Sequence, residues 1–464
     1  MEQAKPQPGM TDMVLDWVRS ARYSTSQIVM GAFLLFILAG SLLLMLPFAT
    51  TGHELRFIDA LFTMTSAVCV TGLIVLDTPN DFTLFGQLVI LLGIQLGGLG
   101  YAATATLLLL AAGRRIGLRE RMVMMEALGA LSMEGLVRLV KTIAVSTLLI
   151  ESLGALILAV RFSFNMDPLR ALYFGIFHSV SAFNNAGFSL FADNLIGYRT
   201  DLTVNLTITM LIVLGGIGFL VYRDVLDNMQ GRRFRLSTHT KLAGLVSLLL
   251  IVVGTVGIWA FEVQNDKTLA AMPFGEQFLA SYFHSVSART AGFNSIDLGL
   301  VGVPTLYFLV LLMLIGGSPG STAGGIKTTT FGIICASIWG TLKGHADVVM
   351  FYRRIPTELV TKSYVLAALA LGLVTGFTML LSYSEDQPFL RIMFEVASAA
   401  GTVGLSTGNG GVLSLSALFS DVGKCVIIVT MFLGRLGPLA IGLFAVKTHE
   451  DLRYRYPEAR VVLG

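Results

Sequence analysis

Four short motifs that each end in glycine have the composition needed to strip water from a cation. Such a site replaces the hydration shell of the ion with backbone carbonyl oxygens, and the turns that this requires often use dihedral angles that glycine adopts at little cost. A single motif of this kind more often marks tight helix packing, so the prediction depends on its recurrence. The predicted filter residues are Val70, Thr71, Gly72, Asn185, Ala186, Gly187, Thr290, Ala291, Gly292, Thr402, Val403 and Gly404.

Each motif belongs to a short, semi-apolar stretch, and the four stretches form an internal repeat. They read FIDALFTMTSAVCVTGL, ALYFGIFHSVSAFNNAGFSL, FLASYFHSVSARTAGFNS and FLRIMFEVASAAGTVGLSTGNG. None is long enough to span a bilayer, so each predicts a helix of about 10 to 12 residues with an extended return, buried in protein or lining a watery cavity. A second glycine cluster follows each motif, at Gly97, Gly215, Gly316 and Gly434. The predicted unit is helix, pore loop, helix, repeated four times in parallel orientation.

Composition places these repeats in a membrane. The 464 residues are 54% hydrophobic and 13% charged, whereas about 25% charged is ordinary for a soluble domain. Eight apolar segments reach the spanning length of about 20 residues, at 27–48, 83–111, 141–161, 202–222, 240–261, 303–339, 360–382 and 421–446. The sequence therefore predicts an all-α membrane protein with eight transmembrane helices in four repeats around one central pore.

The placement of charges predicts the orientation in the membrane. Most of the 32 Lys and Arg residues fall on the side that holds both termini and the segments near 112–141, 223–241 and 340–362. Positive loops stay in the cytoplasm, so both termini should be cytoplasmic and an outer vestibule with excess carboxylates should concentrate cations. The predicted units are an N-terminal segment at 1–26, repeats at 27–112, 140–230, 240–340 and 359–447, and a tail at 448–464.

The sixth apolar segment, 303–339, contains a polar interruption that reads LIGGSPGSTAGGIKTTT. As one unbroken helix the segment would be about 55 Å long, nearly twice the thickness of the hydrocarbon core. The glycines and Pro319 should break it, and its hydroxyl groups can satisfy the freed backbone or offer oxygens to a passing ion. The alternative is a proline-kinked packing helix with small residues at an interface.

Two arginines and one glutamate are expected within the membrane, and each needs its own explanation. Arg435 should lie roughly 21 Å along the last span, too deep for an end residue that reaches the surface, so it should face the pore or form an ion pair with a carboxylate such as Glu395. Arg289, directly before the third motif, should brace that loop from behind, because a cation in the filter would repel another. Glu151 is either its counterpart or a helix-packing group. His178 and His284 are interpreted as structural.

The motifs CVTGL, NNAGFS, RTAGFNS, GTVGLSTGN and IGGSPGSTAGGIKTTT together resemble the Trk, Ktr and HKT superfamily of potassium transporters, from about residue 27 to the end. TVG at 402–404 also resembles part of the potassium-channel filter TVGYG, and the first three motifs depart from it, as is usual in this family. The eight spans and the ending YRYPEARVVLG are most similar to the membrane subunit of bacterial Ktr systems; a Trk-type subunit is the alternative.

The resemblance implies a function for the broken segment and a set of partners. It implies a gate beneath the filter, formed by Gly316, Gly317, Ser318, Pro319, Gly320, Ser321, Thr322, Ala323, Gly324, Gly325, Lys327 and Arg435. It also implies potassium uptake across the bacterial plasma (inner) membrane, a homodimer with one pore per protomer, and a cytosolic ring of nucleotide-binding subunits. Basic loops at 114–121, 232–235 and 353–354 are candidate docking surfaces for that ring, although topology and lipid contacts suffice to explain most of them.

The energy source follows from what the sequence lacks. No G-x-x-x-x-G-K-[ST] motif is present, so we expect no direct use of ATP by this chain. No residues typical of hydrolytic or redox chemistry are evident either, so we expect no enzyme activity and no covalent cofactor. The resemblance implies that a nucleotide binds only the partner subunit. The membrane potential supplies about 2.3 kcal/mol per elementary charge per 100 mV. K⁺ is the predicted cargo and Na⁺ a candidate activator, with no nucleic-acid partner. The alternative is a secondary transporter coupled to Na⁺ or H⁺, which would favour inverted repeats.

Overall fold

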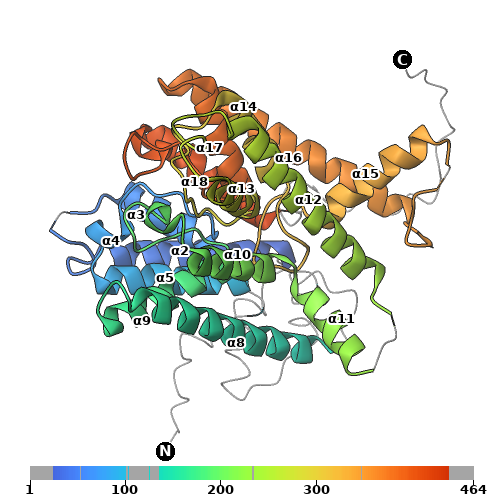
Figure 1. Cartoon of the computed structure of the whole chain (residues 1–464), viewed down its shortest axis with the longest axis horizontal. Coiled ribbons are helices and arrows are strands. Elements are labelled where there is room, and N and C mark those ends of the chain that lie inside the picture. Colours follow the sequence, from blue (N-terminus) through green and yellow to red (C-terminus); the bar gives the residue numbers. More distant parts are fainter. Residues whose placement is uncertain are drawn as a thin grey trace, which may run out of the picture.

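The computed structural model describes residues 25–52, 54–100, 103, 125, 135–231, 235–345 and 347–437. The N-terminal segment before residue 25, the whole basic loop at 114–121, part of the one at 232–235 and the tail at 448–464 lie outside these residues, so the predictions made for them are not addressed by the fold. Within the described part the regular secondary structure is helical apart from one short hairpin (Figure 1).

Four long apolar helices begin the four predicted repeats. They are α2 (Thr25–Leu44), α8 (Leu136–Phe162), α12 (Thr238–Glu262) and α16 (Thr357–Ser384). All four are long and apolar enough to cross a membrane. Leucines such as Leu148, Leu149 and Leu156 on α8 are exposed, as expected of helices that face hydrocarbon.

The second helix of each repeat is shorter than the sequence predicted. These helices are α5 (Leu84–Leu99), α10 (Leu202–Gly216), α14 (Val303–Met313) and α18 (Asp421–Leu436), and each ends at or just before its second glycine cluster. Of the eight predicted spans, four are helices long and apolar enough to cross a membrane within the described residues. The number is five if α10 and α11 (Phe219–Met229) are taken as one bent span. The ends of the predicted segments 83–111 and 421–446 lie outside the described residues.

The breaks in two of these second segments have different forms. Between α10 and α11 the chain bends by 91° at Gly218, whose φ of 97° is left-handed; the predicted span at 202–222 is therefore bent and is not one straight helix, because that backbone angle cannot continue a helix. The predicted interruption of 303–339 is confirmed, since a loop at 314–327 separates α14 from α15 (Thr328–Leu342).

A short helix lies between the long and the second helix of each repeat, as predicted. The four are α3 (Phe57–Val68), α9 (Pro168–Phe183), α13 (Phe274–Ser287) and α17 (Phe389–Gly401), and three of them exceed the predicted length. Each runs directly into a glycine motif. The remaining elements are α4 (Thr78–Asp81), the 3₁₀ turns η1 (Ile196–Tyr198) and η2 (Leu415–Leu418), and a small antiparallel hairpin of β1 (Val349–Met350) and β2 (Arg353–Arg354).

The packing of these helices is cyclic. Each long helix packs on the short helix of its own repeat, as α8 does on α9 and α12 on α13. Each second helix also contacts the short helix of the next repeat, in the pairs α5 and α9, α10 and α13, α14 and α17, and finally α18 and α3. The last pair joins the fourth repeat to the first, so the four repeats close into a ring.

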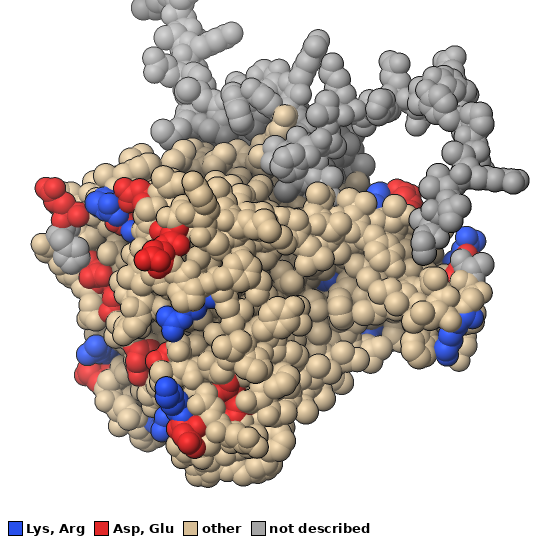
Figure 2. Space-filling model, turned by 90° about the horizontal axis from the view of Figure 1, so that it is seen from above, with Lys and Arg blue, Asp and Glu red and all other residues tan. Residues whose placement is uncertain are grey.

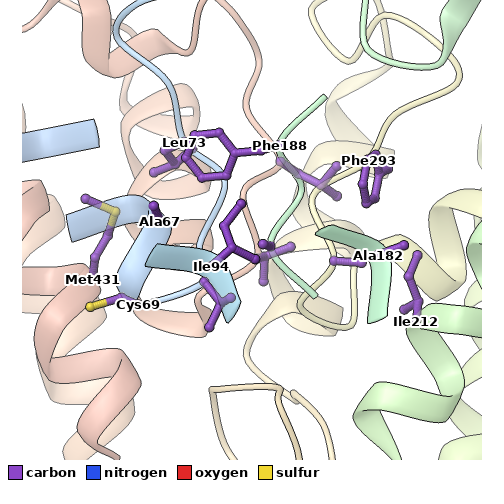
Figure 3. Packing of buried hydrophobic residues seen from close by; sticks show 14 of the residues in the cluster. Ala67, Cys69, Leu73, Ile94, Ala182, Phe188, Ile212, Phe293 and Met431 are labelled. Atoms are coloured by element: carbon purple, nitrogen blue, oxygen red, sulfur yellow. The ribbon is translucent and has the colours of Figure 1, made fainter. Parts of the chain in front are cut away.

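The core of the molecule lies around the glycine motifs. Leu73, Phe188 and Phe293, each directly after a motif glycine, are buried and point into the same central region as Ala67 and Ala182 (Figure 3). By contrast, charged side chains gather toward the two ends of the surface seen in Figure 2 and leave a wide uncharged face between them. A buried centre and an apolar flank are the arrangement expected of a protein surrounded by lipid.

Candidate functional site

The four glycine motifs form a closed ring. A side-chain carbon placed on any one of the four glycines would collide with the carbonyl oxygen that precedes the glycine of the next repeat. This added carbon would lie 2.5 Å from Ala186 O when placed on Gly72 and 2.7 Å from Ala291 O when placed on Gly187. On Gly292 it would lie 2.5 Å from Val403 O, and on Gly404 2.1 Å from Thr71 O. The series returns to the first repeat, so the motifs lie around one axis in chain order, with room between neighbours for glycine alone.

The backbone of the ring follows one pattern in all four repeats. The residue two before each glycine has a left-handed φ, at 51° in Val70, 58° in Asn185, 75° in Thr290 and 52° in Thr402, and each glycine has a φ between 73° and 97°. The middle residue of each motif does not have a left-handed φ. Alternating backbone handedness turns successive carbonyls toward the same side of the chain. A left-handed β-branched residue costs about 1–3 kcal/mol, and such strain concentrates at functional sites.

Buried serines near the ends of the short helices hold this strained backbone. In every repeat a serine carbonyl oxygen accepts a hydrogen bond from the N–H of the middle motif residue. The pairs are Ser66 and Thr71, Ser181 and Ala186, Ser287 and Ala291, and Ser398 and Val403, at 2.8 to 2.9 Å. The Ser66 and Ser398 hydroxyls also accept from the Gly72 and Gly404 N–H groups, both at 3.0 Å. A role for these serines was not predicted from the sequence, although a serine stands five or six residues before the glycine of each motif.

A cavity of about 350 Å³ opens on one side of the ring. All four motif glycines line it, together with Asp77, Asp193 and Asp297 from three different repeats. Burial raises the pKa of Asp77 above its ordinary value, and the charge of Asp81 acts in the same direction. Carboxylates around a recess attract cations and raise their local concentration, so the cavity favours the approach of a cation to the ring.

The loop at 314–327 lies on the opposite side of the ring. It is folded on itself by a parallel bridge between Ile315 and Ile326. A side-chain carbon on Gly324 would lie 2.1 Å from Thr402 Oγ1, and one on Gly316 would lie 3.1 Å from Thr290 Cγ2. Since both threonines begin their motifs, the loop touches the ring at the end away from the acidic cavity.

Hydrogen bonds fasten this loop to the second repeat. The Ser318 N–H donates to Gly216 O at 2.9 Å, and the Phe219 N–H donates to Gly320 O at 2.8 Å. The Thr322 hydroxyl donates to Phe183 O at 3.1 Å. The loop therefore occupies the space that the bend between α10 and α11 leaves, and its freed backbone groups are satisfied by a neighbouring repeat, as irregular backbone at membrane depth requires.

Arg435 joins the loop to two further repeats. From α18 its guanidinium donates one hydrogen bond to Thr322 O in the loop and another to Gly97 O at the end of α5. The alternative of an ion pair with Glu395 is wrong, because that carboxylate accepts instead from Ser406 and Ser416. Lys327, the last residue of the loop, adds a second basic side chain, with its Nζ donating to Ala323 O at 2.7 Å. Two basic side chains thus lie on the side of the ring away from the acidic cavity.

The other singled-out residues face away from the centre of the ring. Arg289 extends behind the third motif and donates to the Ser247 carbonyl and hydroxyl of α12, as expected of a brace. Glu151 accepts from Gln95 and Asn184, so in the described residues its contacts are those of a helix-packing group and do not include Arg289. Among the same residues, no group of three potential metal ligands is found.

The fold and the ring are those of a membrane cation-transport protein. The structure superposes on the potassium transporter TrkH from Vibrio parahaemolyticus with a TM-score of 0.70, covering 92% of this chain and 86% of that one at 18% identity. Residues 16–455 match the protein-family model for TrkH, described as a cation transport protein. The chain therefore belongs to the TrkH family of cation transport proteins.

Relatives with higher identity include two proteins of Ktr systems. The chain is 43% identical to the Ktr system potassium uptake protein B of Bacillus subtilis, over 98% of this chain and 99% of that protein. It is 39% identical to the protein of the same name from Vibrio alginolyticus, over 96% of each, and 37% identical to the potassium/sodium uptake protein NtpJ of Enterococcus hirae, over 96% and 98%. The family membership predicted from the motifs is confirmed.

Proposed function

We propose that this protein takes up potassium ions through the ring of glycine motifs, which acts as a selectivity filter. The observation that carries the proposal is the ring itself, in which four strands with the same alternating backbone meet around one axis. Such strands present stacked carbonyl oxygens, the ligands that replace the water of a dehydrated K⁺ ion. Relatives that share most of the chain and are named as potassium uptake proteins support the same cargo.

The acidic cavity and the cationic loop give the pathway two different ends. Cations enter from the side of Asp77, Asp193 and Asp297, pass the ring, and meet the loop at 314–327 with Lys327 and Arg435. The membrane potential, about 2.3 kcal/mol per charge per 100 mV, drives them inward. The proposed location is the bacterial plasma membrane, with both termini in the cytoplasm, which agrees with this direction of transport.

The loop residues from Gly316 to Lys327, together with Arg435, are proposed as the gate. The loop touches the base of the ring, and Arg435 fixes it to α5 and α18 at the same time. A fixed positive charge repels a cation strongly where water is scarce. Opening then requires the Arg435 hydrogen bonds to Thr322 and Gly97 to break or move together.

Regulation is proposed to come from outside this chain. A cytosolic ring of nucleotide-binding subunits and a second copy of this chain, as a homodimer, are the expected partners, and names such as Ktr system imply more than one component. Activation by Na⁺ belongs to the same proposal. Passage of Na⁺ itself is the second candidate, because the Enterococcus relative is named as a potassium/sodium uptake protein.

Uptake in a bacterial strain that lacks its own potassium transporters tests the proposal. Expression of this chain with its partner subunit should restore growth at low K⁺, and the half-saturation concentration for K⁺ should rise in each of the variants Gly72→Ser, Gly187→Ser, Gly292→Ser and Gly404→Ser. Four well-expressed variants with unchanged half-saturation and unchanged K⁺ to Na⁺ ratios would refute the filter.

A further inference from the structure

A buried carboxylate lies directly behind the fourth motif. Glu395 on α17, with none of its surface exposed, accepts a hydrogen bond from Ser406 Oγ on one oxygen at 2.6 Å. Its other oxygen accepts from the Ser416 N–H at 2.9 Å and the Ser416 hydroxyl at 2.5 Å. All three partners donate, which suits an ionised carboxylate. Glu395 therefore ties its short helix to the segment 406–416 that follows the motif glycine.

This tied segment continues across the ring to the first repeat. The Ser414 hydroxyl accepts from the Ile74 N–H at 2.9 Å, and the Ser414 N–H donates to Ile74 O at 3.0 Å. Ile74 stands two residues after Gly72, at the same place that Ser406 has after Gly404. One carboxylate thus holds the cavity-side ends of two adjacent motifs, its own directly and the first through Ser414.

The second repeat contains the same arrangement with a histidine. His178 occupies the position on α9 that Glu395 has on α17, and its Nε2 lies 3.0 Å from the hydroxyl of Ser189, two residues after the motif glycine. The segment beyond reaches the third repeat. There the Leu195 N–H donates to Asn294 O at 3.1 Å, and the Asn294 N–H donates to Asn194 Oδ1 at 3.4 Å.

The remaining two repeats lack this arrangement in the described residues. At the matching position of the first repeat, the Thr63 hydroxyl donates to Asp59 O of its own helix. In the third repeat, His284 Nδ1 contacts Ala280 O of its own helix, and its Nε2 has no hydrogen-bond partner. The braced repeats, the second and the fourth, are diagonal in the ring, so the cavity-side end of the ring is held by two clamps, one built on a carboxylate and one on an imidazole.

We infer that Glu395 and His178 are positioning residues for ion discrimination, each setting the cavity-side carbonyls of two adjacent filter strands through the segment that it ties. The inference rests on the proposed filter. Neither side chain touches an ion; each acts through a serine and a cross-repeat backbone bond. Discrimination between ions depends on where the carbonyls stand and on how firmly they are held. Loosening one clamp should therefore impair selectivity in half of the ring.

Two variants of one clamp and a matched control test the inference. Glu395→Gln keeps the side-chain shape but turns one acceptor into a donor that faces the serine donors. Ser414→Ala removes only the hydroxyl that receives the Ile74 N–H. Glu262→Gln is the control, because Glu262 is equally buried and is likewise held by several donors, the Gly302 N–H, the Thr305 and Thr268 hydroxyls and the Asn265 side-chain amide. It lies at the end of α12, where the described residues give it no contact with a motif.

The measurement is the ratio of K⁺ to Na⁺ flux in liposomes that contain each purified variant at matched amounts. We expect the ratio to fall about tenfold for Glu395→Gln and severalfold for Ser414→Ala, the size of a lost charged or neutral hydrogen bond, and to stay at the parent value for Glu262→Gln. If Glu395→Gln does not fold, the ratio of K⁺ to Na⁺ flux measured for Ser414→Ala tests the inference by itself.

Two outcomes overturn the inference. In the first, a folded Ser414→Ala and a folded Glu395→Gln keep the parent ratio. In the second, the control loses as much selectivity as they do, which would show a general effect of lost buried bonds. Gly404→Ala is measured alongside: if it changes the ratio while the clamp variants do not, only the clamp fails, whereas unchanged selectivity in Gly404→Ala would remove the filter on which the clamp rests.

Discussion

Gly404→Ala should damage ion binding more than any other alanine substitution in the ring. The added methyl carbon would lie 2.1 Å from Thr71 O, whereas ordinary contact begins at 3.4 Å, so the neighbouring strand must retreat by about 1.3 Å. A carbonyl displaced that far no longer coordinates an ion held by its partners. The loss should resemble that of one hydrogen bond to a charged group, about 1.5–3 kcal/mol, or roughly 10- to 100-fold in half-saturation.

A second glycine separates crowding from backbone strain. Gly52 has a φ of 87°, close to the 92° of Gly404, but a side-chain carbon there would meet nothing within 4 Å. Gly52→Ala therefore carries a similar backbone cost without the collision. K⁺ uptake at graded concentrations should give a raised half-saturation for Gly404→Ala and a parent value for Gly52→Ala. Equal effects in the two variants would refute the reasoning, because the ring would then tolerate a side chain as well as an open loop does.

Three further predictions address the gate, the helix packing and the cavity. Arg435→Ala should raise K⁺ flux with little change in selectivity, and its effect should not multiply with that of a shortened 316–327 loop in liposome measurements, since both relieve one barrier. Lys424→Met should lower the free energy of unfolding by about 2 kcal/mol and leave the ratio of K⁺ to Na⁺ flux unchanged, because it leaves the partly buried Asp59 with Arg56 as its one remaining ion-pair partner among the described residues. Asp77 has a raised pKa, so its charge is present above that pKa and lost as pH falls through it; Asp77→Asn should flatten this part of the pH dependence of K⁺ half-saturation.

Much of the architecture could be predicted from the sequence because it depends on local patterns. The long apolar runs, the four glycine motifs and the interruption around Pro319 were each visible as departures from a plain spanning helix. The 91° bend at Gly218 was not, since the same apolar residues surround it as surround a straight helix, and one glycine within a span more often serves packing.

The details of the ring depend on contacts between distant repeats. Val70, Thr290 and Thr402 are β-branched and avoid left-handed angles on their own, so only the bonds from the buried serines and the closely packed neighbours explain their conformation. Glu395 likewise had an obvious cation to pair with in Arg435. Its actual partners, Ser406 and Ser416, lie on a loop whose path no local pattern predicts.

The most direct test of the central claim is the flux of K⁺ and of Na⁺ through the purified chain in liposomes under an imposed inside-negative potential. Potential-driven transport through a carbonyl filter should give K⁺ entry without ATP or an opposing Na⁺ or H⁺ gradient, with K⁺ preferred over Na⁺, and Gly404→Ala should lower that preference. K⁺ entry that stops when the Na⁺ or H⁺ gradient is collapsed, with the same ion preference in Gly404→Ala, would contradict the account and favour a coupled secondary transporter.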